Sequence, residues 1–230
     1  MSEIDLIAIV DTETSGLDPE EDRVLEIGIV VWSLTEMAMI SARSLLVYTG
    51  DPIPEEAERV HKITPELAAY GMIRDDAANA YHDEIRDAQA IVEYSGTEFD
   101  RGFLRAFGAP SVPWIDTYHC DWPEWSSSRS LVSVAIAHGV AVTGAHRALA
   151  DCLLLARLLR RVRSFGVDPR SLLEHAARPR LTYRALVSYD DRQLAKDHGC
   201  RWDAERRWWV GSCAVVDADA LPYMIDMVTP

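Results

Sequence analysis

The two residues Thr35 and Glu36 are the feature of the sequence that most restricts the fold. They separate the apolar run RVLEIGIVVWSL, residues 23–34, from a second strand-like segment at 37–49. A connection this short between two strands indicates a hairpin, so the two strands are expected to be antiparallel. Residues 4–12 form an earlier apolar run that also reads as a buried strand.

Helical and strand-like segments alternate over the next part of the chain. Helical patterns follow Pro54 and Thr64 and cover residues 75–87, and apolar strand-like runs occupy 88–94 and 114–120. A helix is expected between these two runs, beginning near Thr97, and further helices at 130–139 and 147–163. Three strands, then helices, then strand, helix and strand predict an α/β fold with a mixed sheet flanked by helices.

The chain is expected to contain two domains. Residues 1–166 form the larger one, 167–180 are rich in Arg, Pro and Ser and read as a linker, and 181–230 form a small α+β unit. Within the small unit, DDRQLAKDHG predicts a short helix and CRWDAERRWWVG predicts a hairpin.

Charge and cysteine usage limit the class of protein. The net charge is −14, but residues 1–156 carry 27 acidic and 10 basic side chains, whereas 157–230 carry 10 acidic and 13 basic ones. An acidic body can still bind phosphates if it first binds divalent cations. The four cysteines are scattered without metal-site spacing, and no apolar run or basic leader indicates a membrane span or secretory signal. We expect a cytoplasmic protein with no membrane partner.

Carboxylates stand at unusual places in this apolar framework. Asp11 and Glu13 end the first strand, and because side chains two apart share a face, their carboxylates should lie about 7 Å apart. Asp151 stands in the apolar helix 147–163 without a basic residue at i+4, and Arg147 is its only local partner. Asp100 lies near the start of the helix expected from Thr97. The structural alternatives are that the strand end with Asp11 and Glu13 is exposed to solvent, and that Asp100 is a favourable charge at a helix N-terminus. A bound metal next to Asp151 would compensate its buried charge.

The chain resembles the DEDDh exonucleases, the family of proofreading epsilon subunits and exodeoxyribonuclease X. The three motifs appear in order as DTETSG (11–16), FDRGFL (99–104) and HRALAD (146–151), with VHKIT and WIDT between them. The resemblance implies a ribonuclease H-like fold with a central five-stranded mixed sheet. It implies that four acids hold two Mg²⁺ or Mn²⁺ ions and that one histidine is the general base that takes a proton from the attacking water. These residues are Asp11, Glu13, Asp100, Asp151 and, as the base, His146. The expected product is a nucleoside 5′-monophosphate from a 3′ end.

One departure from the family pattern concerns the substrate. Many members carry His-Asn-Ala shortly before the second motif, whereas this chain has Ser95, Gly96 and Thr97. An Asn side chain that could touch the substrate is therefore missing, while the metal ligands are complete. Thr14 of the first motif is expected to contact nucleic acid.

The C-terminal unit mixes arginines with tryptophans, a combination that can grip phosphates and stack bases. Arg201, Arg206 and Arg207 are expected to contact nucleic acid, and Trp202 and Trp208 to form the core of this small domain. A surface for a protein partner is the alternative.

The favoured function is a 3′–5′ exonuclease acting on DNA, with a polymerase or repair partner. A ribonuclease of the same fold that trims RNA 3′ ends is the first alternative, and a non-catalytic scaffold or polymerase-associated subunit is the second.

Overall fold

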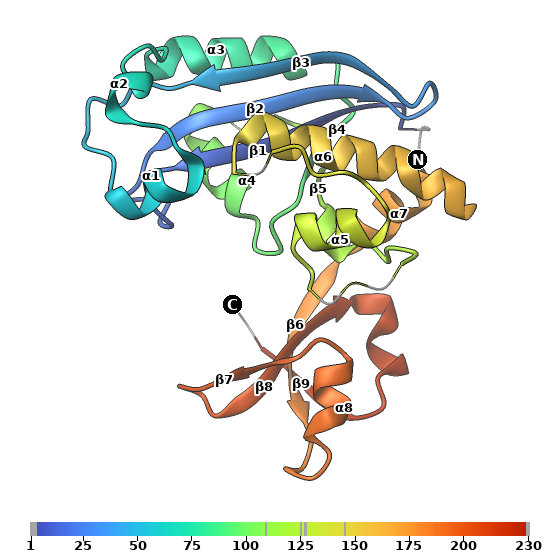
Figure 1. Cartoon of the computed structure of the whole chain (residues 1–230). Helices are drawn as coiled ribbons and strands as arrows, with labels where there is room; N and C mark the ends of the chain where they lie inside the picture. The colour runs from blue at the N-terminus through green and yellow to red at the C-terminus, as the bar shows by residue number, and fades with distance from the viewer. Residues whose placement is uncertain (1–3, 109, 125, 127, 145, 229–230) are drawn as a thin grey trace. The chain divides into compact units, whose positions relative to one another are not determined.

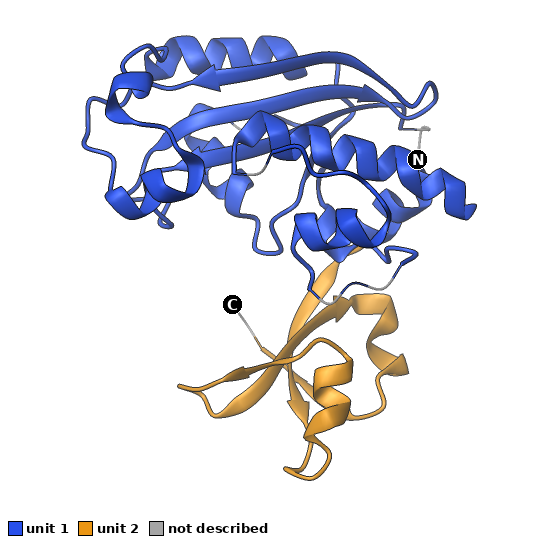
Figure 2. Ribbon diagram, viewed as in Figure 1, with its two compact units in different colours: residues 1–177 blue, residues 178–230 orange. Residues whose placement is uncertain are grey.

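The computed structural model describes residues 4–108, 110–124, 126, 128–144 and 146–228. The chain divides into two compact units, unit 1 at 1–177 and unit 2 at 178–230 (Figure 2). Each unit is described by itself.

Unit 1 is built around a five-stranded mixed sheet (Figure 1). Its strands lie in the order β3-β2-β1-β4-β5; β1 pairs antiparallel with β2, β2 antiparallel with β3, and β1, β4 and β5 are parallel. The hairpin predicted from Thr35 and Glu36 is therefore confirmed, as is the mixed sheet. The strands are β1 (Leu6–Thr14), β2 (Val24–Ser33), β3 (Ala38–Leu46), β4 (Ala90–Glu93) and β5 (Trp114–Asp116).

Helices cover both faces of this sheet. The hydrophobic cluster on one face joins β1 and β2 to α5, α6 and α7, and the cluster on the other face joins them to α3 and α4. This agrees with the α/β fold predicted from the sequence. The helices of unit 1 are α1 (Glu55–His61), α2 (Pro65–Ala68), α3 (Arg74–Ile85), α4 (Phe99–Leu104), α5 (Leu131–Ala137), α6 (Ala148–Arg161) and α7 (Pro169–Ala176), with 3₁₀ turns η1 (Arg105–Phe107), η2 (Thr117–His119) and η3 (Val162–Phe165).

The central strand β1 alternates its side chains between the two faces. Ile7 and Ile9 are fully buried in the cluster with α6, whereas Ala8 and Val10 are buried in the cluster with α3 and α4. Because the side-chain period of a strand is two, Asp11 continues the row that faces α6.

The segment expected as a linker is instead mostly helical. Asp168 accepts a hydrogen bond from the Arg170 amide, and Pro169 occupies the first helical position of α7. Leu172 and Leu173 of this helix are buried in the same core cluster as α6. The reason is packing: α7 is amphipathic and buries its apolar side in unit 1, which therefore extends to residue 177.

Unit 2 is a four-stranded antiparallel sheet with one helix. Its strands lie in the order β7-β8-β6-β9, and β7 and β8 form the hairpin predicted around residues 203–206. The elements are β6 (Arg180–Leu186), α8 (Arg192–Asp197), β7 (Arg201–Asp203), β8 (Trp208–Ala214), the 3₁₀ turn η4 (Val215–Ala220) and β9 (Met224–Met227).

The core of unit 2 differs from the prediction for its tryptophans. Tyr183, Ala185, Ala195 and Cys200 are buried, and Trp209 packs against them. Trp202 is 51% exposed, and Trp208 lies on the opposite sheet face from Trp209 because strand residues alternate. The expected core role of Trp202 and Trp208 is therefore wrong.

All four cysteines are free thiols, and Cys152 is buried in α6. No helix within the described residues is long and apolar enough to cross a membrane.

Candidate active site

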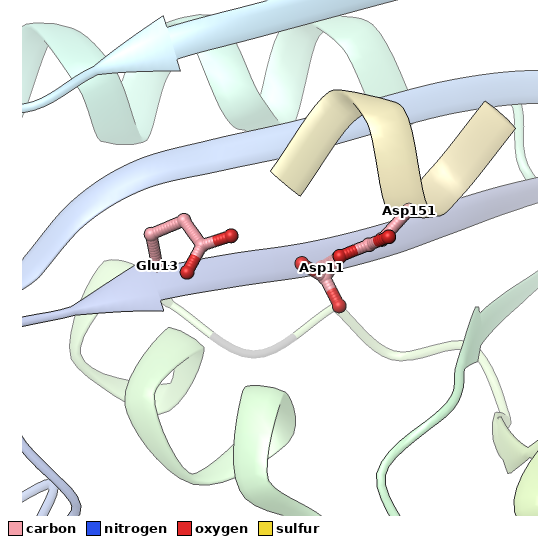
Figure 3. A group of neighbouring side chains, drawn as sticks. All are labelled: Asp11, Glu13 and Asp151. Carbon is pink, nitrogen blue, oxygen red and sulfur yellow. The ribbon is translucent and has the colours of Figure 1, made fainter. Parts of the chain in front are cut away.

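The end of β1 and the first turns of α6 bring three carboxylates together. Ligand oxygens of Asp11, Glu13 and Asp151 all lie within 4.8 Å of one another (Figure 3). Asp11 and Glu13 come from one strand, and Asp151 reaches them from the helix above it, although 138 positions separate it from Glu13 in the numbering. The grouping expected from the sequence is thus present for three of the four acids.

A glycine allows α6 to approach the sheet this closely. Gly28 of β2 is the register partner of Asp11 on β1. A Cβ atom at Gly28 would lie 2.3 Å from the backbone carbon of Ala148 and 2.4 Å from the amide of Leu149, distances that real Cβ atoms do not reach. The first turn of α6 therefore rests on backbone at this point, and this contact sets the height of Asp151 above Asp11.

An ion pair fixes the start of α6 laterally. The Glu26 carboxylate of β2 accepts hydrogen bonds from Arg147 Nε at 2.8 Å and Nη2 at 2.9 Å, and from the Ala148 amide at 3.3 Å. Arg147, which the sequence offered as a local partner for Asp151, is thus paired with Glu26. Burial would raise the pKa of Glu26, but the hydrogen bonds from Arg147 and Ser44 bring it below its ordinary value.

The fourth acid, Asp100, lies outside the three-carboxylate group. It is 3% exposed, and its Oδ1 accepts hydrogen bonds from the Thr12 amide at 2.8 Å and the Thr12 hydroxyl at 2.7 Å. Thr12 stands between Asp11 and Glu13 on β1, so Asp100 is anchored to the strand that carries them. The Arg101 amide of α4 donates to Glu93 Oε2 at 3.2 Å, which holds this helix to β4.

Burial and mutual repulsion alter the acidity of the site. The pKa of Asp11 is raised well above its ordinary value by burial and by the charges of Asp100, Asp151 and Glu13. Burial and the neighbouring acids raise the pKa of Glu13 to about 8, and burial raises that of Asp100 to about 6. Burial also raises the pKa of Asp151. Carboxylate oxygens are hard ligands, so a divalent cation such as Mg²⁺ or Mn²⁺ fits this donor set and would relieve the repulsion.

His146 lies on the loop that enters α6. Its backbone φ is +60°, in the left-handed region, and its amide donates to Asp151 Oδ2 at 3.1 Å. His146, Asp11 and Asp151 line one pocket of 340 Å³. His146 thus lies just before α6, which agrees with the helix expected from residue 147.

Of the residues expected to contact nucleic acid, Thr14 is buried in unit 1, whereas the three arginines of unit 2 are exposed. Thr14 is buried, and its hydroxyl donates to the Gly16 carbonyl at 2.6 Å. Arg201, Arg206 and Arg207 are exposed on the β7–β8 hairpin of unit 2. The Arg206 guanidinium lies 5.9 Å from the centre of the Trp208 ring.

Sequence reasoning missed Glu26 and Gly28. Both interrupt an otherwise continuous apolar run, VLEIGIVVW, that is buried along its whole length. A charged residue and a glycine inside a fully buried strand were available signals, since each is disfavoured there unless a partner approaches. Their partner, the start of α6, could not be identified without the fold.

Together, the sheet order, the helices on both faces and the acids at the end of the central strand define a ribonuclease H-like protein. A family model described as Exonuclease, of the RNase T type, matches residues 8–159. The chain therefore belongs to the DEDDh exonuclease family. A second model, described as a domain of unknown function (DUF8626), matches residues 181–228.

Several known proteins are similar to this chain. An exonuclease X solved in complex with 5′-overhanging duplex DNA is 25% identical to this chain, with a TM-score of 0.56. The match covers 73% of this chain and 98% of the exonuclease X chain. Exonuclease I of E. coli, in its zinc-bound complex with single-stranded DNA, is 18% identical to this chain, with a TM-score of 0.63. The match covers 80% of this chain and 48% of the exonuclease I chain. The DNA polymerase III subunit epsilon of Treponema pallidum (strain Nichols) is 37% identical over 57 residues, which are 25% of this chain. The match spans about a quarter of that relative's length.

Proposed function

We propose that this chain is a metal-dependent 3′–5′ exonuclease that releases nucleoside 5′-monophosphates from DNA 3′ ends. The observation that carries the proposal is the group of Asp11, Glu13 and Asp151, whose oxygens lie within 4.8 Å of one another in a member of the exonuclease family. Nearby, Asp100 is anchored to the same strand through Thr12.

The four acids would hold two Mg²⁺ or Mn²⁺ ions. When bound, such ions supply electrophilic stabilisation of the phosphate oxygens at the scissile bond. The protein's own contribution is placement: β1 fixes Asp11 and Glu13, and the Glu26–Arg147 ion pair and Gly28 fix the helix that carries Asp151. Raised pKa values of Asp11 and Glu13 support this role, because strongly perturbed acids gather at functional sites.

His146 would act as the general base. It lines the same pocket as Asp11 and Asp151, so it can take a proton from a water that attacks a phosphate bound there. The hydrogen bond from its backbone amide to Asp151 holds the loop against the start of α6.

DNA is favoured as the substrate because the similar exonuclease X and exonuclease I were solved with DNA. The similarity to an epsilon subunit supports a polymerase or repair partner, and the four free thiols support a cytoplasmic location. Arg201, Arg206 and Arg207 of unit 2, and Thr14, would contribute to nucleic-acid binding.

A degradation assay tests the proposal. Purified full-length chain is incubated with single-stranded DNA, 5′-overhanging duplex DNA and RNA, labelled in turn at each end, in Mg²⁺, Mn²⁺ or EDTA. We expect stepwise shortening of the DNA from its 3′ end, no activity in EDTA, and none in Asp11→Asn or Asp151→Asn. Asp87→Asn is the matched control because Asp87 is an exposed acid of the same unit.

Each other outcome contradicts a stated part of the proposal. Faster degradation of RNA than of DNA would favour the exoribonuclease. Full activity in Asp151→Asn would show that the proposed acidic group is not the active site. Nucleic-acid binding without any metal-dependent hydrolysis would favour the scaffold.

A further inference from the structure

The pocket that contains the carboxylates also has an aromatic and cationic part. Besides Asp11, Asp151 and His146, the side chains of Tyr118 and Arg129 line it. Its volume of 340 Å³ lies at the lower end of the range of about 300–1,000 Å³ typical of small-ligand sites. A ligand of nucleotide size is compatible with this volume.

Tyr118 and Arg129 form one structural element, here called the Tyr118–Arg129 wall. The Arg129 guanidinium carbon lies 5.3 Å from the centre of the Tyr118 ring, and the Tyr94 ring meets Tyr118 edge-on at 5.9 Å. The Tyr94 hydroxyl donates to the Arg129 carbonyl at 2.8 Å, and this hydrogen bond holds the backbone of Arg129 in place.

The turn between β4 and α4 fixes the position of the Tyr118 ring. Asp116 accepts hydrogen bonds from the amides of Ser95 at 3.1 Å, Gly96 at 2.6 Å and Tyr118 at 3.0 Å. Gly96 has φ +83°, and a Cβ atom there would lie 3.0 Å from the Tyr118 ring. The ring therefore packs against the residue that replaces the Asn of many relatives.

The charge of Arg129 is available to a ligand. Within the described part of the chain, Arg129 forms no ion pair, and its side chain makes one hydrogen bond, from Nη2 to the Cys120 carbonyl at 3.4 Å. An exposed guanidinium in a pocket that also holds carboxylates suits a phosphate, since arginine presents several donors to phosphate oxygens.

We infer that the Tyr118–Arg129 wall binds the terminal nucleotide of the substrate strand, with the base against the Tyr118 ring and Arg129 on a phosphate oxygen. This inference rests on the proposed exonuclease function and assigns the substrate grip that the missing Asn leaves open. The wall acts in binding rather than in the chemical step, because neither residue belongs to the acidic group or carries the general base.

Steady-state kinetics of the full chain on a short single-stranded DNA tests the inference, with Mn²⁺ present. Arg129→Gln should raise KM about tenfold or more with little change in kcat, as expected when a charged hydrogen bond is removed equally from ground and transition states. The dependence of log KM on log salt concentration should also become shallower by about one unit. Arg105→Gln, an exposed arginine of the same unit, is the matched control.

A pair of variants at Tyr118 separates stacking from structure. Tyr118→Leu should raise KM about tenfold, within the range for removal of one base–aromatic stack, whereas Tyr118→Phe keeps the ring and should behave as wild type. Equal KM values and salt slopes in Arg129→Gln and Arg105→Gln would overturn the inference, as would a normal KM in Tyr118→Leu. Inactive wild-type protein would instead overturn the exonuclease proposal itself.

Discussion

Glu26 of β2 and Arg147 at the start of α6 form a two-contact ion pair, with N–O distances of 2.8 and 2.9 Å. Glu26 is 1% exposed, and it lies on the strand beside Glu13 while Arg147 stands between His146 and the helix of Asp151. One ion pair, buried on the Glu26 side and partly exposed on the Arg147 side, thus connects the two elements that carry the acidic group.

Removal of one member of this pair should destabilise unit 1 strongly. Glu26→Gln leaves the partly exposed Arg147 without its counter-charge, and loss of hydrogen bonds to a charged group costs about 1.5–3 kcal/mol. Because the pair lowers the pKa of Glu26, its contribution is present above the ordinary pKa of Glu and is lost as the pH falls through the folded value. Urea unfolding measures the change. Arg59→Gln, which breaks the exposed Glu55–Arg59 pair, should cost less than about 1 kcal/mol; equal effects would contradict the assigned role.

A methyl group at Gly28 should impair catalysis more than stability. Gly28→Ala places a Cβ against the backbone of Ala148 and moves the first turn of α6 away from β1. A displacement of about 1 Å in a catalytic group can cost about 100-fold in rate, so kcat should fall by that order while the cost in folding stays near 1–3 kcal/mol. Gly102→Ala is the control, since its Cβ would meet only Pro19 at 3.6 Å. Unchanged kcat in Gly28→Ala would contradict the role of this contact.

Replacement of His146 should affect the chemical step and leave the metal site intact. His146→Asn is preferred to alanine because its backbone lies in the left-handed region, which Asn tolerates. Loss of a general base lowers kcat by roughly 10²–10⁴-fold. Calorimetric titration with Mn²⁺ should give the wild-type affinity, and His198→Asn in unit 2 should have normal kcat. A large loss of Mn²⁺ affinity would instead make His146 part of the metal site.

Glu93 should make the metal-free protein less stable as the pH rises. Burial, followed by the charges of Asp100 and Asp116, raises its pKa from 4.5 to about 8. Between these values the folded state keeps a proton that the unfolded chain has lost, so the free energy of unfolding falls with increasing pH. Glu93→Gln should reduce this slope by at most about 1.4 kcal/mol per pH unit between pH 5 and 8. Urea unfolding in EDTA at several pH values measures it; an unaltered slope would show that Glu93 ionises normally.

The exposed arginines of the β7–β8 hairpin should change DNA affinity rather than turnover. Replacing Arg201, Arg206 and Arg207 together with Gln should flatten the salt dependence of binding by about one unit for each phosphate that an arginine no longer neutralises. The matched control replaces three exposed arginines of unit 1, Arg59, Arg86 and Arg105, by Gln. Fluorescence anisotropy with single-stranded DNA compares the two. Identical slopes would favour a protein-partner role for unit 2.

The sequence was sufficient for features that depend on local spacing. Alternation along β1 predicted that Asp11 and Glu13 share a face, and the helix expected at 147–163 left His146 just before its start. The two-residue gap at Thr35 and Glu36 predicted the hairpin correctly. Each of these follows from the geometry of one element or one connection.

Features that depend on contacts between distant elements were not predictable. Gly28 matters only because Ala148 lies against it, and Tyr118 matters only because it fills the space beside Gly96. Asp168 and Pro169 are start signals for the helix α7, although the Arg, Pro and Ser content around them is typical of a linker. In unit 2, strand register determines which tryptophan packs against the core: Trp209 does, whereas Trp202 and Trp208 do not.

The register of β1 and β2 has a consequence for how the protein assembles. Asp11 pairs with Gly28 and Glu13 with Glu26. A slip of one residue would turn every side chain of one strand to the opposite face. If β1 turned, the acids would be separated from α6, and if β2 turned, Glu26 would be withdrawn from Arg147. Only the native alignment brings Asp11, Glu13 and Asp151 together as the proposed cation ligands, so under the proposed function a divalent ion in the medium should favour correctly paired chains during refolding.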